Sequence, residues 1–253
     1  MTQPKITVGI LALQGAFMEH KFHLQKAIRH ARPGSPLDTT KFDIIEVRTQ
    51  EQLASADALV IPGGESTAIS LIAERTGLLE PLRQFVRVDR KPVWGTCAGL
   101  ILLSDEASRA KKGGQELIGG LHVRCQRNHF GRQTESFVCN LPLPFVGDDE
   151  PPFSAVFIRA PIVEKVLTGA DATADIAEGV VRAPKLEVDS YKHAQIEVIS
   201  SLPPTQGKEA GDIVAVRQGN IFGTSFHPEL TPDVRLHGWW LQECVLRRNE
   251  LRK

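Results

Sequence analysis

The chain has 253 residues, of which 42% are hydrophobic and 24% are charged, and a chain of this length can bury a sizeable core. Thirty basic residues balance thirty acidic ones, so the composition lacks the excess positive charge typical of proteins that bind nucleic acid or anionic membranes. No run of about 18 apolar residues occurs, and we therefore expect no membrane span.

Strand-like and helix-like patterns alternate over the first half of the chain. In order, they predict a strand at 6–13, a helix at 16–29, strands at 42–48 and 58–64, a helix at 66–87, a strand at 91–97 and a helix at 98–108. Either Ser66 or Thr67 is expected to cap the second helix. This alternation is typical of a mostly parallel sheet with helices on both faces.

From about residue 120 the pattern changes to shorter strand-like runs, which predict antiparallel additions at one side of the sheet. These runs lie at 121–127, 136–141, 154–161, 194–201, 213–219 and 220–227. An amphipathic helix is expected at 233–253. We predict a single domain of three layers over 1–253, with Pro/Gly-punctuated loop insertions near 30–41 and 168–212.

Four cysteines, with neither a C-x-x-C pair nor zinc-ligand spacing, indicate a reducing compartment, and we expect the cytoplasm. One of them, Cys97, lies in GTCAG, where a strand pattern becomes helical. In such a turn the side chain stands above the sheet as a nucleophile, and the N–H of Ala98 points to where an oxyanion would form. A buried thiol beside two packing glycines is the alternative.

A thiolate nucleophile needs a base and a group that orients the base. His227 and Glu229 lie two residues apart in SFHPEL and would point to the same side of an extended segment. They could equally be a loop histidine and an acid at a helix start. The other histidines are expected at the surface or at caps: His20, His23, His30, His122, His129, His193 and His237.

The segment VIPGGEST (60–67) is a strand that runs into two glycines, whose backbone amides are free to reorient as an oxyanion hole requires. A phosphate cradle is less favoured because the lysine and spacing of a P-loop are missing. A plain turn between strand and helix is the remaining alternative.

The motifs PGGES, GTCAG and HPE, in that order, resemble those of class I, triad-type glutamine amidotransferases. The segments GILALQGAFMEH, RNHFGRQTESF and FIRAP are similar to the glutaminase subunits of pyridoxal 5'-phosphate synthase, and the resemblance spans residues 6 to about 245. It implies a flavodoxin-like fold without cofactor or metal. It also implies hydrolysis of L-glutamine to L-glutamate and ammonia by Cys97, His227 and Glu229, with an oxyanion hole at Gly64 and Ala98.

The resemblance further implies which residues grip the glutamine substrate. They are Gly64, Glu65, Ser66, Arg127, Ile158 and Arg159, with Gln14 on the oxyanion-hole side. The implied partner is a (β/α)₈-barrel synthase subunit that forms a dodecamer, carries up to twelve glutaminase subunits and raises their activity on docking.

Two alternatives stay open at this point. The chain could be a glutaminase for another acceptor, such as the cyclase of histidine biosynthesis, whose triad would be identical. It could also be a non-catalytic binding module with a redox-sensing cysteine, although such a module would not require both His227 and Glu229.

Overall fold

The computed structural model describes residues 5–109, 115–127, 129, 136–147, 149–168, 171, 175–185, 194–203 and 211–247. Its helices are α1 (Phe17–Arg29), α2 (Pro36–Thr39), α3 (Gln50–Ser55), α4 (Ser66–Arg75), α5 (Leu79–Arg83), α6 (Ala98–Leu103) and α7 (Arg235–Trp240). Shorter helical turns are η1 (Gln84–Val88), η4 (Pro228–Leu230) and η5 (Leu241–Leu246).

The first strands along the chain are β1 (Lys5–Leu11), β2 (Lys41–Val47), β3 (Ala58–Ile61), β4 (Val93–Thr96), β5 (Ser104–Ser108), β6 (Leu121–Gln126) and β7 (Phe137–Leu141). The remaining strands are β8 (Phe153–Phe157), β9 (Ile162–Val166), β10 (Val180–Arg182), β11 (Ile196–Ser201), β12 (Ile213–Gln218) and β13 (Ile221–Thr224).

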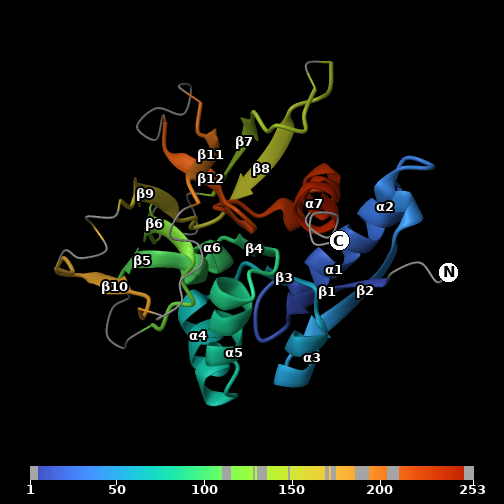
Figure 1. Cartoon of the computed structure of the whole chain (residues 1–253). Coiled ribbons are helices and arrows are strands. Elements are labelled where there is room, and N and C mark those ends of the chain that lie inside the picture. The colour runs from blue at the N-terminus through green and yellow to red at the C-terminus, as the bar shows by residue number, and fades with distance from the viewer. Residues whose placement is uncertain are drawn as a thin grey trace.

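One sheet of eleven strands runs through the molecule in the order β10-β5-β6-β9-β12-β13-β4-β3-β1-β2, with β11 added beside β12 (Figure 1). The five neighbours β2, β1, β3, β4 and β13 are all parallel. Beyond β13 the pairings are antiparallel except for β5 with β6, and β7 and β8 form a separate hairpin. The expected parallel sheet with antiparallel additions is confirmed.

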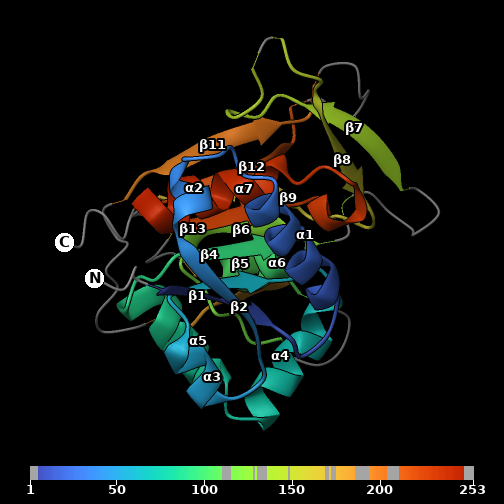
Figure 2. The same ribbon diagram turned by 90° about the vertical axis from the view of Figure 1, so that its right-hand side faces the viewer.

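Successive side chains of the central strands enter two cores on opposite faces of the sheet. Val60 and Trp94 pack on one face with residues of α1, α2 and α7, whereas Leu59 and Val93 pack on the other with residues of α3 to α6. Figure 2 shows the sheet between these two helical layers. The near-continuous apolar runs in β3 and β4 follow from burial on both sides.

The helix expected at 98–108 is wrong in its second half, because α6 ends at Leu103 and the chain continues as strand β5. Ser104 donates its hydroxyl to Leu100 O at 2.7 Å. Glu106 is buried in β5 and accepts a hydrogen bond from Arg124 of β6 at 2.7 Å. A buried carboxylate needs such a partner, and this one lies on the neighbouring strand rather than on the same helix.

The helix expected at 66–87 is divided into α4, α5 and η1. Gly77, with φ at 70°, takes the left-handed conformation that ends α4. The cap of α4 also differs from expectation, because the Glu65 carboxylate accepts hydrogen bonds from Thr67 N at 3.1 Å and Ala68 N at 2.7 Å. Glu65 is therefore the N-cap, one residue before the hydroxyl side chains favoured by the sequence.

The expected insertions contain short elements, of which the strand near 194–201 was predicted, and the expected carboxyl-terminal helix is present over part of its range. The segment 30–41 carries α2, and 168–212 contributes β10 and β11, while 169–170, 172–174, 186–193 and 204–210 lie outside the described residues. In the expected terminal helix, α7 and η5 cover 235–246, and 248–253 lie outside the described residues.

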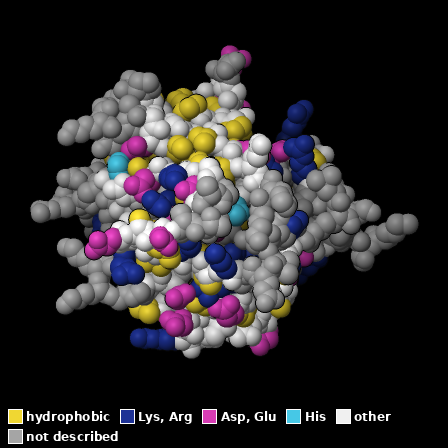
Figure 3. Space-filling model, turned by 60° about the vertical axis from the view of Figure 1, so that its left-hand side comes forward, with side chains coloured by type: hydrophobic (Ala, Val, Ile, Leu, Met, Phe, Trp, Pro, Cys, Tyr) yellow, Lys and Arg dark blue, Asp and Glu magenta, His cyan; other side chains and the backbone are white. Residues whose placement is uncertain are grey.

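Charged side chains of both signs are interspersed on the face drawn in Figure 3, in keeping with the zero net charge. Within the described ranges, no helix combines the length and the apolar character needed to cross a bilayer. All four cysteines are buried and unpaired.

Candidate active site

The candidate site lies where the parallel strands β1, β3, β4 and β13 end. Their carboxyl ends meet at one edge of the sheet because these strands are neighbours and parallel. The chain then enters four loops, at 12–16, 62–65, 97–98 and 225–229. Ligands of open α/β sheets bind at this edge, so the fold brings the sequence motifs to the expected place.

Cys97 occupies a strained turn between β4 and α6. Its φ is 49° and its ψ is −99°, a backbone conformation that residues with a Cβ rarely adopt. The turn is held by a hydrogen bond from Cys97 N to Thr224 O of the adjacent strand at 2.8 Å. The side chain is buried, and the predicted turn from strand to helix is present.

His227 and Glu229 form a hydrogen-bonded pair, with 2.8 Å between His227 Nδ1 and Glu229 Oε1. A hydrogen bond from His227 N to Val156 O at 2.8 Å fixes the backbone against β8. Glu229 is buried, whereas the His227 side chain keeps 12% of its surface exposed. The carboxylate therefore orients the ring through Nδ1 and leaves Nε2 available to another partner.

The His227 imidazole packs against a glycine of the loop after β3. A Cβ placed on Gly63 would lie 2.4 Å from His227 Cε1 and 3.5 Å from Cys97 Cβ, so the histidine ring and the cysteine meet the same residue. Gly15 has φ at 97°, and a Cβ there would lie 1.9 Å from Gly63 O. The loops after β1 and β3 can approach this closely only with glycine at position 15, whereas glycine at position 63 makes room for the His227 ring.

The charges of the pair are coupled to Cys97. Burial alone would lower the pKa of His227, but the hydrogen bonds with Cys97 and Glu229 outweigh burial and raise it to about 10. Burial would likewise raise the pKa of Glu229, but the neighbouring imidazoles of His20 and His227 hold it below its ordinary value. The arrangement thus favours an imidazolium next to an ionised carboxylate.

One of the predicted substrate residues, Arg127, contacts the start of α4. Arg127, directly after β6, places Nη2 3.5 Å from Glu65 Oε1 and 3.4 Å from Thr67 Oγ1. Burial and the positive charge of Arg159 lower the pKa of Arg127, whereas Glu65 raises it, so both charged groups lie within electrostatic range. Arg159 has a strained φ of 46° and follows Ile158 at the end of β8.

The loop after β1 reaches the same place through Gln14. Its Oε1 accepts a hydrogen bond from Glu65 N at 2.8 Å and would lie 2.4 Å from a Cβ on Gly64. Ala98 begins α6, where the first N–H groups have no acceptor within the helix. The structure therefore brings Gln14, Gly64, Glu65 and Arg127 together, and it places Ala98 directly after Cys97.

Gln115 is a residue of this site that the sequence did not indicate. It is buried before β6, and its Oε1 accepts a hydrogen bond from Ser66 Oγ at 3.2 Å. Its Nε2 and the Nη1 of Arg127 are buried without a hydrogen-bond partner within the part of the chain that the structure describes. No local motif marks Gln115, because its contact with Ser66 is tertiary.

The expectation that His20 and His237 lie at the surface or at caps is wrong, because both side chains are completely buried. His20 lies on the face of α1 that also buries Leu24 and Ala27. This spacing of four and seven residues is the helical period, and it could have indicated the burial of His20 from sequence. His193 lies outside the described residues.

The class of the protein follows from the position of the thiol. Hydrolytic triads on doubly wound sheets place the nucleophile on the turn from strand to helix, and here a histidine paired with a glutamate faces a cysteine there. This is the arrangement of the triad-type glutamine amidotransferases. Comparison with known families agrees: the SNO glutamine amidotransferase family matches residues 10–179 and 169–246, and the chain belongs to this family.

Proteins similar to this chain come from plants, fungi and bacteria. The "Probable pyridoxal 5'-phosphate synthase subunit PDX2" of Arabidopsis thaliana is 41% identical over 94% of this chain and 85% of its own length. The "Pyridoxal 5'-phosphate synthase subunit PdxT" of Streptomyces avermitilis is 44% identical over 91% and 90%. A solved structure described as "glutamine amidotransferase" has a TM-score of 0.65 and 35% identity, covering 93% of this chain and 97% of that chain.

Proposed function

We propose that this chain hydrolyses L-glutamine to L-glutamate and ammonia and supplies the ammonia to a pyridoxal 5'-phosphate synthase subunit. The observation that carries the proposal is the contact of Gly63 with both Cys97 and His227, together with the 2.8 Å bond from His227 to Glu229. Cys97 as the nucleophile, His227 as the base and Glu229 as the orienting carboxylate would then lie side by side in space, as acyl transfer requires.

In the proposed reaction His227 takes the proton of the Cys97 thiol, and the sulfur attacks the side-chain amide carbon of glutamine. The resulting oxyanion accepts hydrogen bonds from the N–H groups of Gly64 and Ala98. His227 then gives its proton to the departing nitrogen, so ammonia leaves and a thioester remains. A water molecule loses a proton to His227 and attacks the thioester, which releases glutamate and restores the thiol.

Glutamine is proposed to bind through its charged end. Arg127 and Arg159 would hold the α-carboxylate, and Glu65 would hold the α-ammonium, with Gly64, Ser66, Ile158 and Gln14 shaping the pocket. The buried, unpartnered Nη1 of Arg127 supports this assignment, because a guanidinium is well suited to a carboxylate.

The acceptor of the ammonia is proposed from the names of the relatives, which are subunits of pyridoxal 5'-phosphate synthase. The partner would be the (β/α)₈-barrel subunit of that enzyme, assembled as a dodecamer that carries up to twelve copies of this chain. Docking is proposed to activate a glutaminase that is slow in isolation, through the loop that carries Gly63 and Gly64.

The test is ammonia release from glutamine by the pure chain, alone and with the barrel subunit. The wild-type chain is expected to release ammonia faster when the barrel subunit is present. The Cys97→Ala variant is expected to release none, with or without the barrel subunit. Cys244→Ala, which removes another buried thiol, is the matched control and should keep its turnover. Turnover of the Cys97→Ala variant would contradict the triad, and equal rates with and without the partner would contradict the activation.

A further inference from the structure

The triad continues into the interior beyond Glu229. His20 Nε2 lies 3.4 Å from Glu229 Oε2 and 3.2 Å from Thr96 Oγ1, while its Nδ1 lies 3.0 Å from His237 Nε2. The side chains of His20 and Glu229 are both fully buried. Glu229 thus presents one carboxylate oxygen to His227 and the other to His20, which comes from α1.

Glu229 Oε2 has no hydrogen-bond partner among the described residues, so a group that carries a proton must face it to offset the loss of water. His20 faces this oxygen at a distance that permits an ion pair or a long, shared hydrogen bond. The hydroxyl of Thr96, the residue directly before Cys97, shares the same ring nitrogen.

The carboxylate determines which nitrogen of His20 carries the proton. A neutral ring with its lone pair on Nε2 would repel Glu229, so the proton must be on Nε2. His20 Nδ1 is then an acceptor and receives the Nε2–H of His237 at 3.0 Å. His237 Nδ1, which is buried without a partner among the described residues, is in turn the nitrogen without a proton.

We propose that His20 is a positioning residue for the triad, whose Nε2–H holds the Glu229 carboxylate in the orientation and the charge state that His227 requires. The proposal rests on the proposed function, because it assigns a role within the same triad. His20 contacts no reacting atom and transfers no proton; it acts only through Glu229. His237 and Thr96 in turn fix the ring of His20.

The electrostatics agree with this geometry. Burial lowers the pKa of His20, and Glu229 acts against burial, so the ring is a neutral donor near pH 7. The groups that act on it are Glu229 and His227 from the loop after β13, and His23 and Glu19 from α1. From α7, His237 is also buried, and burial holds its pKa well below the ordinary value.

A purely structural histidine would fill the same space beside Trp94, with 5.5 Å between the ring centroids. Two substitutions separate the roles. His20→Leu fills the volume without an N–H, whereas His20→Gln keeps an amide N–H near the position of Nε2. Leu24→Ala, on the same buried face of α1, is the control that lowers stability without touching Glu229.

With the activated complex, we expect His20→Leu to lower kcat about tenfold or more, with little change in KM. We expect the acid limb of the kcat/KM profile to move to higher pH, because the pKa of the Glu229 carboxyl, followed by ¹³C NMR, should rise when the His20 N–H is lost. His20→Gln should restore most of the lost kcat and most of the shift in the Glu229 pKa. If kcat and the Glu229 titration of His20→Leu match those of Leu24→Ala, the positioning role is overturned.

Wild-type protein provides a test that depends neither on a variant nor on turnover. The ¹⁵N shifts of His20 are expected to show a neutral ring with its proton on Nε2, and a proton on Nδ1 would overturn the proposal. Absence of glutamine turnover by the wild type would reject the proposed function, yet it would leave this measurement of the His20 and Glu229 pair interpretable.

Discussion

Backbone strain marks the candidate site at the scale of single residues. Among the described residues, Arg90, Cys97 and Arg159 are the non-glycine residues with positive φ, and two of the three belong to the predicted site. Each such residue costs roughly 1–3 kcal/mol and persists only where the surroundings over-determine it. At Cys97 the surroundings are the strand bond to Thr224 and the start of α6.

The pKa of His227 is the most direct test of the coupling between the triad residues. Wild type is expected to titrate near 10, so the imidazolium persists through neutral pH and is lost only as the pH rises through that value. In Cys97→Ala the pKa of His227 should fall toward its ordinary value, because burial lowers this pKa and one of the two groups that raise it is lost. Glu229→Gln removes the charge of the other group and should lower the pKa as well. NMR of ¹⁵N-labelled histidine measures all three proteins, and a wild-type pKa below that of Cys97→Ala would contradict the coupling.

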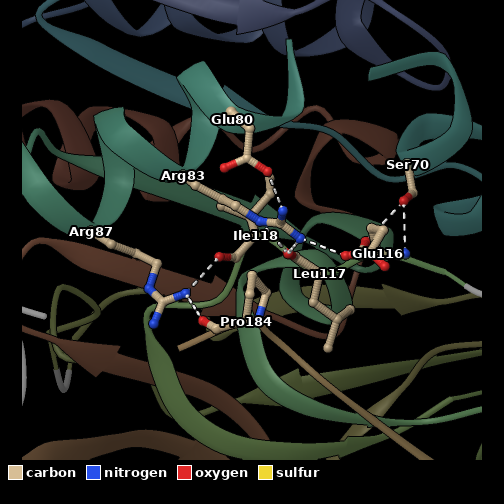
Figure 4. A network of polar contacts seen from close by, with 8 residues as sticks. All are labelled: Ser70, Glu80, Arg83, Arg87, Glu116, Leu117, Ile118 and Pro184. Atoms are coloured by element: carbon tan, nitrogen blue, oxygen red, sulfur yellow. Dashed lines mark hydrogen bonds and ion pairs between the residues drawn. The ribbon is translucent and has the colours of Figure 1, made fainter. Parts of the chain in front are cut away.

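At the scale of elements, two buried arginines hold the segment that carries Gln115 against the helices (Figure 4). Arg83 of α5 donates Nε and Nη2 to Leu117 O at 3.0 and 2.7 Å and pairs with Glu116 at 2.7 Å. Arg87 of η1 donates Nη1 to Ile118 O of the same segment at 3.5 Å and to Pro184 O at 2.7 Å. Arg83 ends α5 and Arg87 lies in η1, and because they are four residues apart they lie on the same face of this helical segment.

Arg83→Met is therefore expected to destabilise the chain by about 2–3 kcal/mol, because the buried Leu117 carbonyl loses its donors. KM for glutamine should rise as well, since Gln115 and its bond to Ser66 lose their anchor. Urea unfolding and steady-state kinetics measure the two effects. Arg75→Met, at an exposed position of α4, is the control and should change neither. Equal stability of the two variants would show that the arginine network does not hold this segment.

The sequence predicts the elements whose signals are local. The alternation of strands and helices, the elbow at Cys97 and the glycine loop after β3 could be read directly, because each depends on neighbouring residues. The switch from α6 to β5 could not, since it depends on the contact of Glu106 with Arg124 on another strand. The contact of His20 with Glu229 also joins distant segments, although helical spacing could have indicated that His20 is buried.

At the scale of the whole molecule, the cysteines lie in two kinds of place: the two hydrophobic cores, and the sheet edge that carries the candidate site. Cys125 lies in one core and Cys244 in the other, whereas Cys97 lies at the edge beside His227. Burial raises the pKa of both Cys125 and Cys244 to about 12. Only a thiolate reacts readily with electrophiles. In the native fold we therefore expect Cys97 to be reactive, and Cys125 and Cys244 to be unreactive.

Thiol labelling therefore distinguishes the site from the core. At pH 8 about one in 10⁴ of the Cys125 and Cys244 side chains would be ionised, even before their lack of access is considered. Iodoacetamide is expected to label Cys97 alone in the native protein, because Cys97 lies at the sheet edge beside His227, whereas the other three thiols are packed in the cores. Labelling of Cys125 and Cys244 should require opening of the cores, so its rate should rise with urea together with global unfolding. Mass spectrometry of peptides from native, urea-treated and Cys97→Ala protein measures each site. Rapid labelling of Cys244 in native protein, at the rate of Cys97, would contradict the burial of that core.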